Sequence, residues 1–114
     1  MPTYTIRTVI RWEAGWSPGQ KNSYEERITA WNAESMEQAI DLAEEDAKRY
    51  AESIKGEALD LFQAFWLFEE IDSIPNGTEM FSLLRGSDLD SRAYIDAFFA
   101  TGHEHQVEYD PPGD

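Results

Sequence analysis

The two histidines lie close together near the C-terminus and are the clearest candidates for chemistry. His103, Glu104 and His105, followed by Glu108 and Asp110, offer nitrogen and oxygen ligands that a metal ion could use. Their polar surroundings contain nothing that would hold such ligands in place, so we expect a solvated tail and no metal site. The chain has no Cys, which excludes thiolate zinc sites, disulfides and cysteine catalysis. The sequence therefore predicts no catalytic residue and no cofactor.

Carboxylates are the other chemically capable groups, and several are neighbours in the sequence, at positions 25–26, 44–46 and 69–70. Paired carboxylates can divide the roles of acid and base when they share a site. Adjacent residues of a strand point to opposite faces, so Glu25 and Glu26 are not expected to share a proton. We expect these acids to lie on solvated faces, and Arg27 to pair with an acid on a neighbouring strand.

The chain is strongly acidic, with 23 Asp and Glu against 9 Lys and Arg and a net charge of −14. Residues 1–33 hold 3 acids and 4 bases, which leaves 20 acids and 5 bases in residues 34–114. Nucleic acids and anionic membranes are bound by clustered Lys and Arg, so this balance argues against both as direct partners. A basic protein would be attracted, although the same acidity is also typical of proteins that are acidic only for solubility.

A chain of 114 residues has the length of one domain, and 41% hydrophobic residues suffice for one core. We expect residues 1–102 to form a single α+β domain and residues 103–114 a polar, disordered tail. No segment has the roughly 20 apolar residues of a membrane span, and the N-terminus lacks the regions of a signal peptide. The sequence therefore predicts a cytoplasmic protein.

Apolar periodicity predicts a hairpin and a long helix in the N-terminal half. Residues 3–12 and 24–33 alternate apolar and polar side chains, which indicates two strands. The residues between them are rich in Gly, Pro, Ser and Asn and predict an exposed loop. A capping pattern at Ser35 and an apolar stripe beyond it predict a helix over 35–55, with Gly56 just past its end.

The C-terminal half predicts two more strands and a second helix. Residues 58–72 are apolar at both odd and even positions, which is typical of a strand in the interior of a sheet. The Pro-Asn-Gly sequence at 75–77 is a hairpin signal, so residues 78–84 should return as a fourth strand. Ser87 or Asp88 would then cap the second helix.

This order predicts an α+β fold, β-β-α-β-β-α, with a four-stranded antiparallel sheet in the order 2-1-3-4 and helices packed mainly on one face. On the face without helices, Phe62, Trp66 and Phe68 would form an apolar patch of a kind that monomers rarely expose. A second copy of the chain in a homodimer would cover this patch, or the second helix or the tail would wrap over it.

Three motifs resemble a known family: Tyr24-Glu25-Glu26-Arg27, the Ala33-Glu34-Ser35 helix entry with Ala39, Ala43 and Glu44, and Asn76-Gly77-Thr78-Glu79-Met80-Phe81-Ser82. On these residues the chain, from about Tyr4 to Leu84, resembles the small bacterial proteins of domain of unknown function 4288. The resemblance implies a compact α+β bacterial domain and brings no activity or catalytic residue. Small acidic bacterial domains of this broad type are often immunity proteins that neutralise toxins, which is an analogy only.

Two features are the sequence candidates for binding a partner. Trp16 lies among Gly, Ser and Pro residues with little nearby to bury it, and exposed Trp is enriched at binding hot spots. Trp16 could instead fold back on the edge of the sheet or complete a homodimer. Glu69, Glu70 and Asp72 form an acidic cluster near the predicted hairpin turn. Together with the net charge, they predict a non-enzymatic protein-interaction module, such as an immunity or inhibitor protein for a basic toxin.

Two alternatives stay open. A small-molecule-binding or enzymatic domain would use an aromatic-lined pocket formed by Trp31, Tyr50, Phe65 and Trp66. A purely structural homodimer would need no other partner, and its dissociation would depend on dilution.

Overall fold

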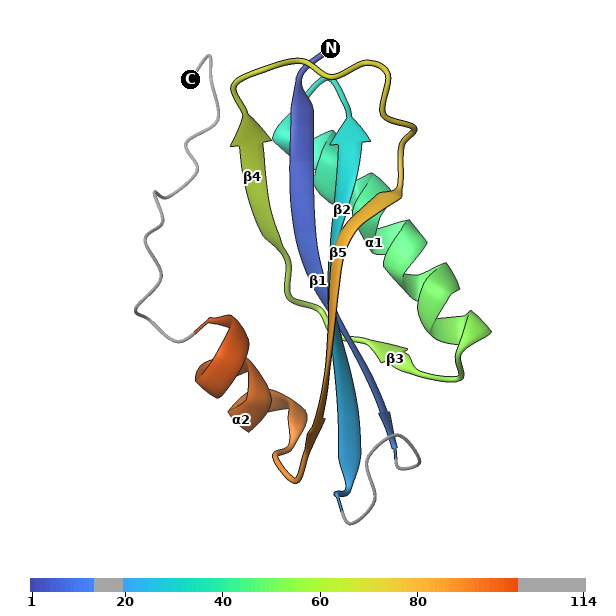
Figure 1. The fold of residues 1–114 in the computed structure, drawn as a ribbon, viewed down its shortest axis with the longest axis vertical. Coiled ribbons are helices and arrows are strands. Elements are labelled where there is room, and N and C mark those ends of the chain that lie inside the picture. The colour runs from blue at the N-terminus through green and yellow to red at the C-terminus, as the bar shows by residue number, and fades with distance from the viewer. Residues whose placement is uncertain (14–19, 101–114) are drawn as a thin grey trace.

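The computed structural model describes residues 1–13 and 20–100 and shows an α+β fold with one antiparallel sheet and two helical segments (Figure 1). This confirms the predicted class. The sheet has five strands, because the third predicted strand is interrupted and forms two short ones.

A long hairpin forms the centre of the sheet. β1 (Thr3–Glu13) and β2 (Asn22–Asn32) pair over their full length. Alternate side chains of β1 point to opposite faces, and Val9 on one face is as fully buried as Ile6 and Ile10 on the other. Both faces of the hairpin are therefore covered by other elements.

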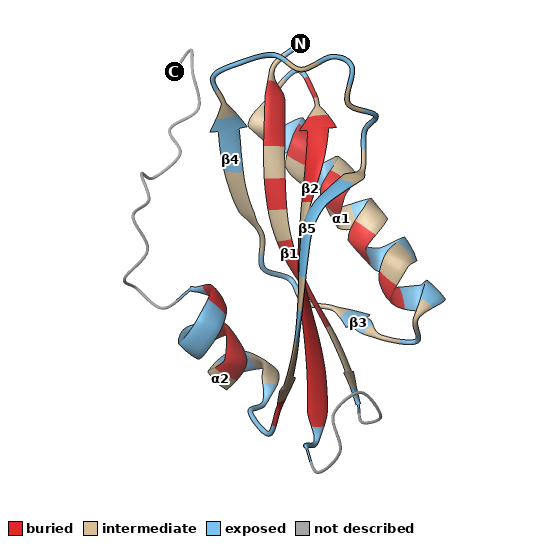
Figure 2. Ribbon diagram, in the orientation of Figure 1, coloured by how far each residue is buried: buried red, intermediate tan, exposed pale blue. Residues whose placement is uncertain are grey.

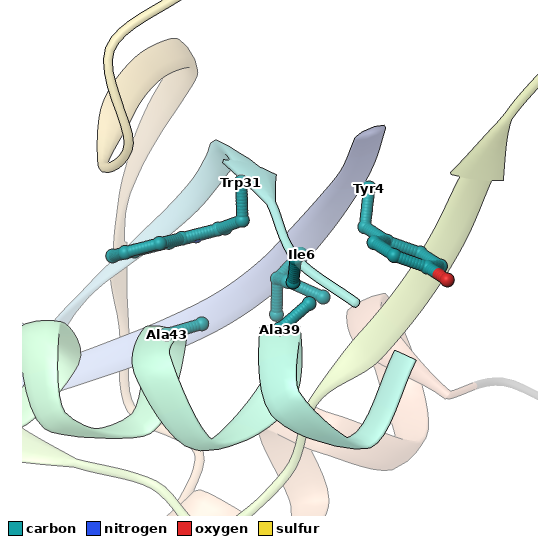
Figure 3. Close-up of a cluster of buried hydrophobic side chains, with 6 residues drawn as sticks. Tyr4, Ile6, Trp31, Ala39 and Ala43 are labelled. Carbon is teal, nitrogen blue, oxygen red and sulfur yellow. The ribbon is translucent and has the colours of Figure 1, made fainter. Parts of the chain in front are cut away.

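The helix α1 (Met36–Ser53) covers one of these faces. It begins as the capping pattern predicts, because Ser35 Oγ accepts a hydrogen bond from the Gln38 backbone N–H at 3.1 Å. Figure 3 shows part of the contact between the helix and the hairpin. Residues at every fourth position are small and buried, so the helix backbone can lie close to the sheet: Ala39, Ala43, Ala47 and Ala51.

The edges of the sheet differ from the prediction. β3 (Glu57–Ala58) and β4 (Gln63–Leu67) both pair with β1, whereas β5 (Thr78–Ser87) pairs with β2. The third predicted strand therefore lies beside the first, as expected. The predicted order 2-1-3-4 is wrong for the fourth strand, which lies at the opposite edge (Figure 1). The most apolar strand thus forms an edge and not the interior of the sheet.

The connection between β4 and β5 crosses the end of the hairpin instead of turning back on β4. Gly77 adopts a φ of 86°, which agrees with the predicted turn, and its N–H donates to the Ala30 carbonyl at 2.9 Å. The Asn76 side chain accepts a hydrogen bond from the Asn32 N–H at 2.7 Å. Both turn residues therefore contact β2, and β5 continues along that strand.

The second helical segment lies on the face opposite α1, which contradicts the prediction of both helices on one face. α2 (Ser91–Tyr94) continues into the π-helical segment η1 (Ile95–Phe99), and its apolar residues pack on Val9 and Tyr24. Two helices on one face would leave these buried residues exposed. Figure 2 shows the buried hairpin between the helices.

The cap of this segment is also two or three residues later than predicted. Asp90 Oδ1 accepts a hydrogen bond from the Ala93 N–H at 2.8 Å. Ser87 ends β5, and the Asp88 side chain accepts a hydrogen bond from the Lys21 N–H at 2.9 Å. Ser87 therefore belongs to the strand and Asp88 to the connection, and neither caps the helix.

The connection between α1 and β3 passes so close to β1 that only glycine fits at position 56. A Cβ on Gly56 would lie 2.9 Å from the Arg11 carbonyl oxygen and 3.1 Å from Ile10 Cγ2. We expect Gly56→Ala to lower the free energy of unfolding by about 1–3 kcal/mol, because a buried strand backbone must move to make room. Urea denaturation would measure the change. Glu52→Ala, an exposed change in the last turns of the same helix, should alter stability by less than about 0.5 kcal/mol; equal effects of the two variants would contradict the close approach.

Candidate partner-binding surface

The strand β4 lies at one edge of the sheet and exposes large aromatic side chains. β4 pairs with β1 on one side, and within residues 1–13 and 20–100 no strand pairs with its other side. The exposed fraction is 45% for Phe65, 54% for Trp66 and 89% for Phe68, which follows the strand directly. The rings of Trp66 and Phe68 lie 5.1 Å apart. Clustered exposed aromatic residues of this kind mark interaction surfaces in soluble proteins.

Phe62 does not belong to this exposed group. It is half-buried against the cluster of Tyr4 and Ile6 under α1. Trp66 lies opposite Tyr4 in the sheet, on the face that carries α1. The predicted face without helices does not exist, because each face of the sheet carries one helical segment. The structure therefore separates Phe62 from the exposed Trp66 and Phe68.

The predicted acidic cluster follows β4 directly. Glu69, Glu70 and Asp72 are all exposed, and we call these three residues the acidic corner. The N-terminal amine of Met1 lies 3.4 Å from Glu70 Oε2 and 3.9 Å from Asp72 Oδ1, and ion pairs this exposed are weak. The acidic corner follows the exposed aromatic residues directly in the chain, so both lie at the same end of β4. The other predicted contact, Trp16, lies outside the described residues.

A first buried charge network joins α2 to the sheet. The Glu26 carboxylate accepts hydrogen bonds from the Tyr94 hydroxyl at 2.8 Å, from Arg7 Nε at 3.1 Å and from Arg85 Nη1. The ring of Tyr94 also stacks on Tyr24, with centroids 3.8 Å apart. Burial raises the pKa of Tyr94 to about 12, and the hydrogen bond to Glu26 adds to this while that from Arg85 opposes it.

The same network holds the end of η1 and the start of β4. Arg7 Nη1 donates to Gln63 Oε1 at 2.7 Å and to the Phe99 carbonyl at 3.2 Å. Arg7 Nη2 donates to the Phe98 carbonyl at 2.9 Å, so one guanidinium binds the free carbonyls at the end of the helical segment. Gln63 Nε2 donates to the Phe99 carbonyl at 2.9 Å. The first residue of β4 is thereby fixed to both the sheet and η1.

A second buried network lies on the other face and joins α1 to the sheet. The Glu25 carboxylate accepts hydrogen bonds from the Tyr50 hydroxyl at 2.5 Å and from the Ser82 hydroxyl. The Arg27 guanidinium lies 3.7 Å from the centre of the Tyr50 ring, and its Nε donates to Glu79 Oε1 at 2.8 Å. Burial raises the pKa of Tyr50 to about 12, and its hydrogen bond to Glu25 contributes.

The expectation that these acids are solvated is therefore wrong for Glu25 and Glu26, whose exposed fractions are 6% and 4%. They do point to opposite faces, so they share no proton, as predicted. The predicted pairing of Arg27 with an acid on the next strand is confirmed by Glu79. Each carboxylate accepts hydrogen bonds on both oxygens. Their role is therefore to attach a helix to each face rather than to transfer protons.

A signal for these networks was present in the sequence. Three consecutive charged residues, 25–27, interrupt a strand whose other residues suit a core on at least one face. In a central strand such charges must be buried, and buried charges need partners. The three charges alone do not predict the burial of these residues, because a strand at the edge of a sheet would expose the same residues to solvent.

The four aromatic residues of the alternative pocket do not converge. Trp31 is buried among the side chains under α1, and its Nε1 donates to Thr29 Oγ1 at 2.8 Å. Tyr50 is bound to Glu25. Phe65 and Trp66 are adjacent in β4 and therefore point to opposite faces of the sheet. These side chains do not line one cavity.

Two further features of the sequence lie outside the described residues, a Gly-x-Ser-x-Gly pattern and the two histidines. Residues 15–19, Gly-Trp-Ser-Pro-Gly, have the spacing of the nucleophile loop of α/β hydrolases, but that loop requires a strand followed by a helix. Here these residues connect two antiparallel strands, β1 and β2. His103 and His105 are likewise not described. In the described part of the chain, no group of side chains could hold a metal ion.

Comparisons with protein-family models, with curated proteins and with solved structures found no match. The resemblance to domain of unknown function 4288 therefore stays a prediction from the three motifs. None of the helices in the described ranges has the length and apolar character needed to span a membrane.

We expect Glu26→Gln to lower the free energy of unfolding by about 3 kcal/mol, because it leaves the guanidinium groups of Arg7 and Arg85 without their anionic partner. Urea denaturation followed by circular dichroism would measure it. The matched control is Glu13→Gln, which removes an exposed carboxylate 3.5 Å from Arg11 and should cost less than about 0.5 kcal/mol. Equal losses in the two variants would show that the Glu26 network does not stabilise the fold.

The raised tyrosine pKa values predict a loss of stability in alkali. An ordinary tyrosine has a pKa of 10.0, whereas Tyr50 and Tyr94 have pKa values of about 12. Between pH 10 and pH 12 the unfolded chain therefore releases two protons that the folded chain retains, and stability falls as the pH rises through this range. Urea midpoints across this range would measure the fall. The double variant Tyr50→Phe, Tyr94→Phe should show a flatter dependence, and an unchanged slope would contradict the assignment.

Proposed function

We propose that this protein is a non-enzymatic protein-interaction module that binds a basic protein. The observation that supports it is the surface formed by Trp66, Phe68 and the acidic corner, which combines exposed aromatic rings with exposed negative charge. Aromatic side chains supply most of the binding energy at protein interfaces, and charge of one sign selects and steers the partner. An immunity or inhibitor protein for a basic toxin is the biological role that this chemistry fits.

The charge outside the hairpin favours the same conclusion. The hairpin residues 1–33 hold nearly equal numbers of acids and bases, and their ion pairs lie largely inside the molecule. The excess of 15 negative charges is carried by residues 34–114. A potential of this sign and size attracts a basic partner over several ångströms at low ionic strength and weakens with added salt.

A homodimer is the second candidate, because Trp66 and Phe68 could be covered by a second copy of the chain. Two copies of charge −14 repel each other, and salt would weaken this repulsion. Salt therefore separates the candidates: added salt should weaken binding of a basic protein and strengthen self-association. Sedimentation over a range of protein concentrations and salt would measure the second effect.

The binding proposal is tested by charge reversal at two places. The protein is immobilised, a bacterial lysate is passed over it at low salt, and retained proteins are identified by mass spectrometry. We expect a basic protein that is released by rising salt. The variant with Glu69, Glu70 and Asp72 changed to Lys should not retain it.

The matched control reverses three exposed acids of α1, Asp41, Glu45 and Glu52, to Lys. It makes the same change in net charge at a distant place, so it should retain the protein. Equal loss in both triple variants would mean that net charge alone attracts the protein. Retention by both would exclude the acidic corner as the contact.

A further inference from the structure

We propose that the free edge of β4 binds an extended segment of its partner as an additional strand of the sheet, and that this segment is apolar in the middle with Lys or Arg at both ends. This rests on the proposed function and specifies what the surface binds and how. Strand addition is an established mode of recognition, in which backbone hydrogen bonds provide affinity and alternate side chains provide specificity.

The edge of β4 lacks the features that protect edge strands from pairing. Proteins usually protect edges with Lys, Pro, a bulge or an inward-pointing charge. The five residues of β4, Gln-Ala-Phe-Trp-Leu, contain none of these, and their register with β1 is regular from Gln63 to Leu67. Alternate residues of such a strand direct their N–H and C=O groups away from β1. Among residues 1–13 and 20–100, no other strand pairs with these groups.

The opposite edge of the sheet differs. β5 has a register shift opposite Ile28 and Thr29, which disturbs the regular backbone pattern. It also carries Glu79 and Arg85, which are charged and paired with residues of β2. The contrast assigns strand addition to β4 and not to β5.

The side chains of β4 indicate an apolar middle for the incoming segment. Phe65 and Trp66 are adjacent, so one exposed ring stands on each face of the sheet. Residues of an added strand would lie beside these rings on both faces, where aromatic and β-branched neighbours are favoured. The incoming segment should therefore be apolar at both odd and even positions.

The charges on either side of β4 indicate basic ends. Residues 57–72 contain no Lys or Arg, and their five acids lie before and after the uncharged strand: Glu57, Asp60, Glu69, Glu70 and Asp72. A segment with a base at each end would satisfy these charges in either direction along the edge. A second copy would not, because antiparallel pairing of two β4 strands brings Asp60 of one copy toward Glu69 and Glu70 of the other.

Selection of short random peptides displayed on phage, with the full chain as the target, tests the proposal. We expect enrichment of peptides with a central run of β-branched or aromatic residues and Lys or Arg on both sides. Enriched peptides without this pattern, or no enrichment, would overturn it. Amide hydrogen exchange with the tightest peptide should slow at residues 63–67 and stay unchanged at residues 78–87.

A pair of matched variants locates the site. Phe65→Lys and Phe81→Lys each place a positive charge on an exposed phenylalanine of an edge strand, and neither removes a fully buried side chain. Phe65→Lys should weaken binding of the selected peptide by about tenfold or more, whereas Phe81→Lys should change it by less than about twofold. Trp66→Ala, which adds no charge, should also weaken binding. Equal effects of the two Lys variants would overturn the assignment to β4.

The outcomes separate this inference from the proposed function. If a basic protein is retained through the acidic corner but the β4 variants and the exchange of residues 63–67 are unaffected, strand addition is wrong and the interaction function stands. If no basic protein or peptide binds, both are wrong. If the N–H groups of residues 63–67 that point away from β1 are protected without peptide and the protein sediments as a dimer, the edge is occupied by a second copy and the basic segment is wrong.

Discussion

The fold depends on burying charged side chains on both faces of one central strand. Glu25 and Arg27 of β2 point to one face and Glu26 to the other, and all three are almost fully buried. A buried charge is tolerated only when it has partners close by. The helix α1 brings Tyr50 to one face, and α2 brings Tyr94 to the other. Each face thus receives one helix, and each helix supplies a tyrosine hydroxyl that donates a hydrogen bond to a buried carboxylate.

The network on the α2 face also fixes the start of β4, the strand that carries the candidate binding surface. Arg7 contacts Glu26, the first residue of β4 and the last carbonyls of η1 at the same time. An edge strand that is fixed at its start loses less conformational entropy when a partner binds to it. The structure therefore combines a rigid support with exposed Phe65 and Trp66, which is the arrangement expected of a preformed binding edge.

Acidic residues serve two purposes in this chain, and their surroundings distinguish them. The buried acids Glu25 and Glu26 accept hydrogen bonds on both carboxylate oxygens and attach the helices to the sheet. The exposed acids after β4, Glu69 and Glu70, lie in a stretch that contains no Lys or Arg from residue 57 to residue 72. In the proposed interaction, this local charge density, rather than the total of −14, would select the basic partner.

The sequence by itself determined the local elements. The period-two alternation of β1 and β2, the Ser35 cap and the positive φ of Gly77 follow from local chemistry, so they could be predicted. It also indicated the acidic corner, because adjacent acids after an apolar strand are visible in the chain. Only the tertiary structure decided the order of the strands, the placement of the helices on opposite faces and the burial of Glu25 and Glu26. These features depend on contacts between residues far apart in the sequence, such as Asn76 with Asn32, Gly77 with Ala30 and Tyr94 with Glu26, and local periodicity does not reveal which distant partner a side chain meets.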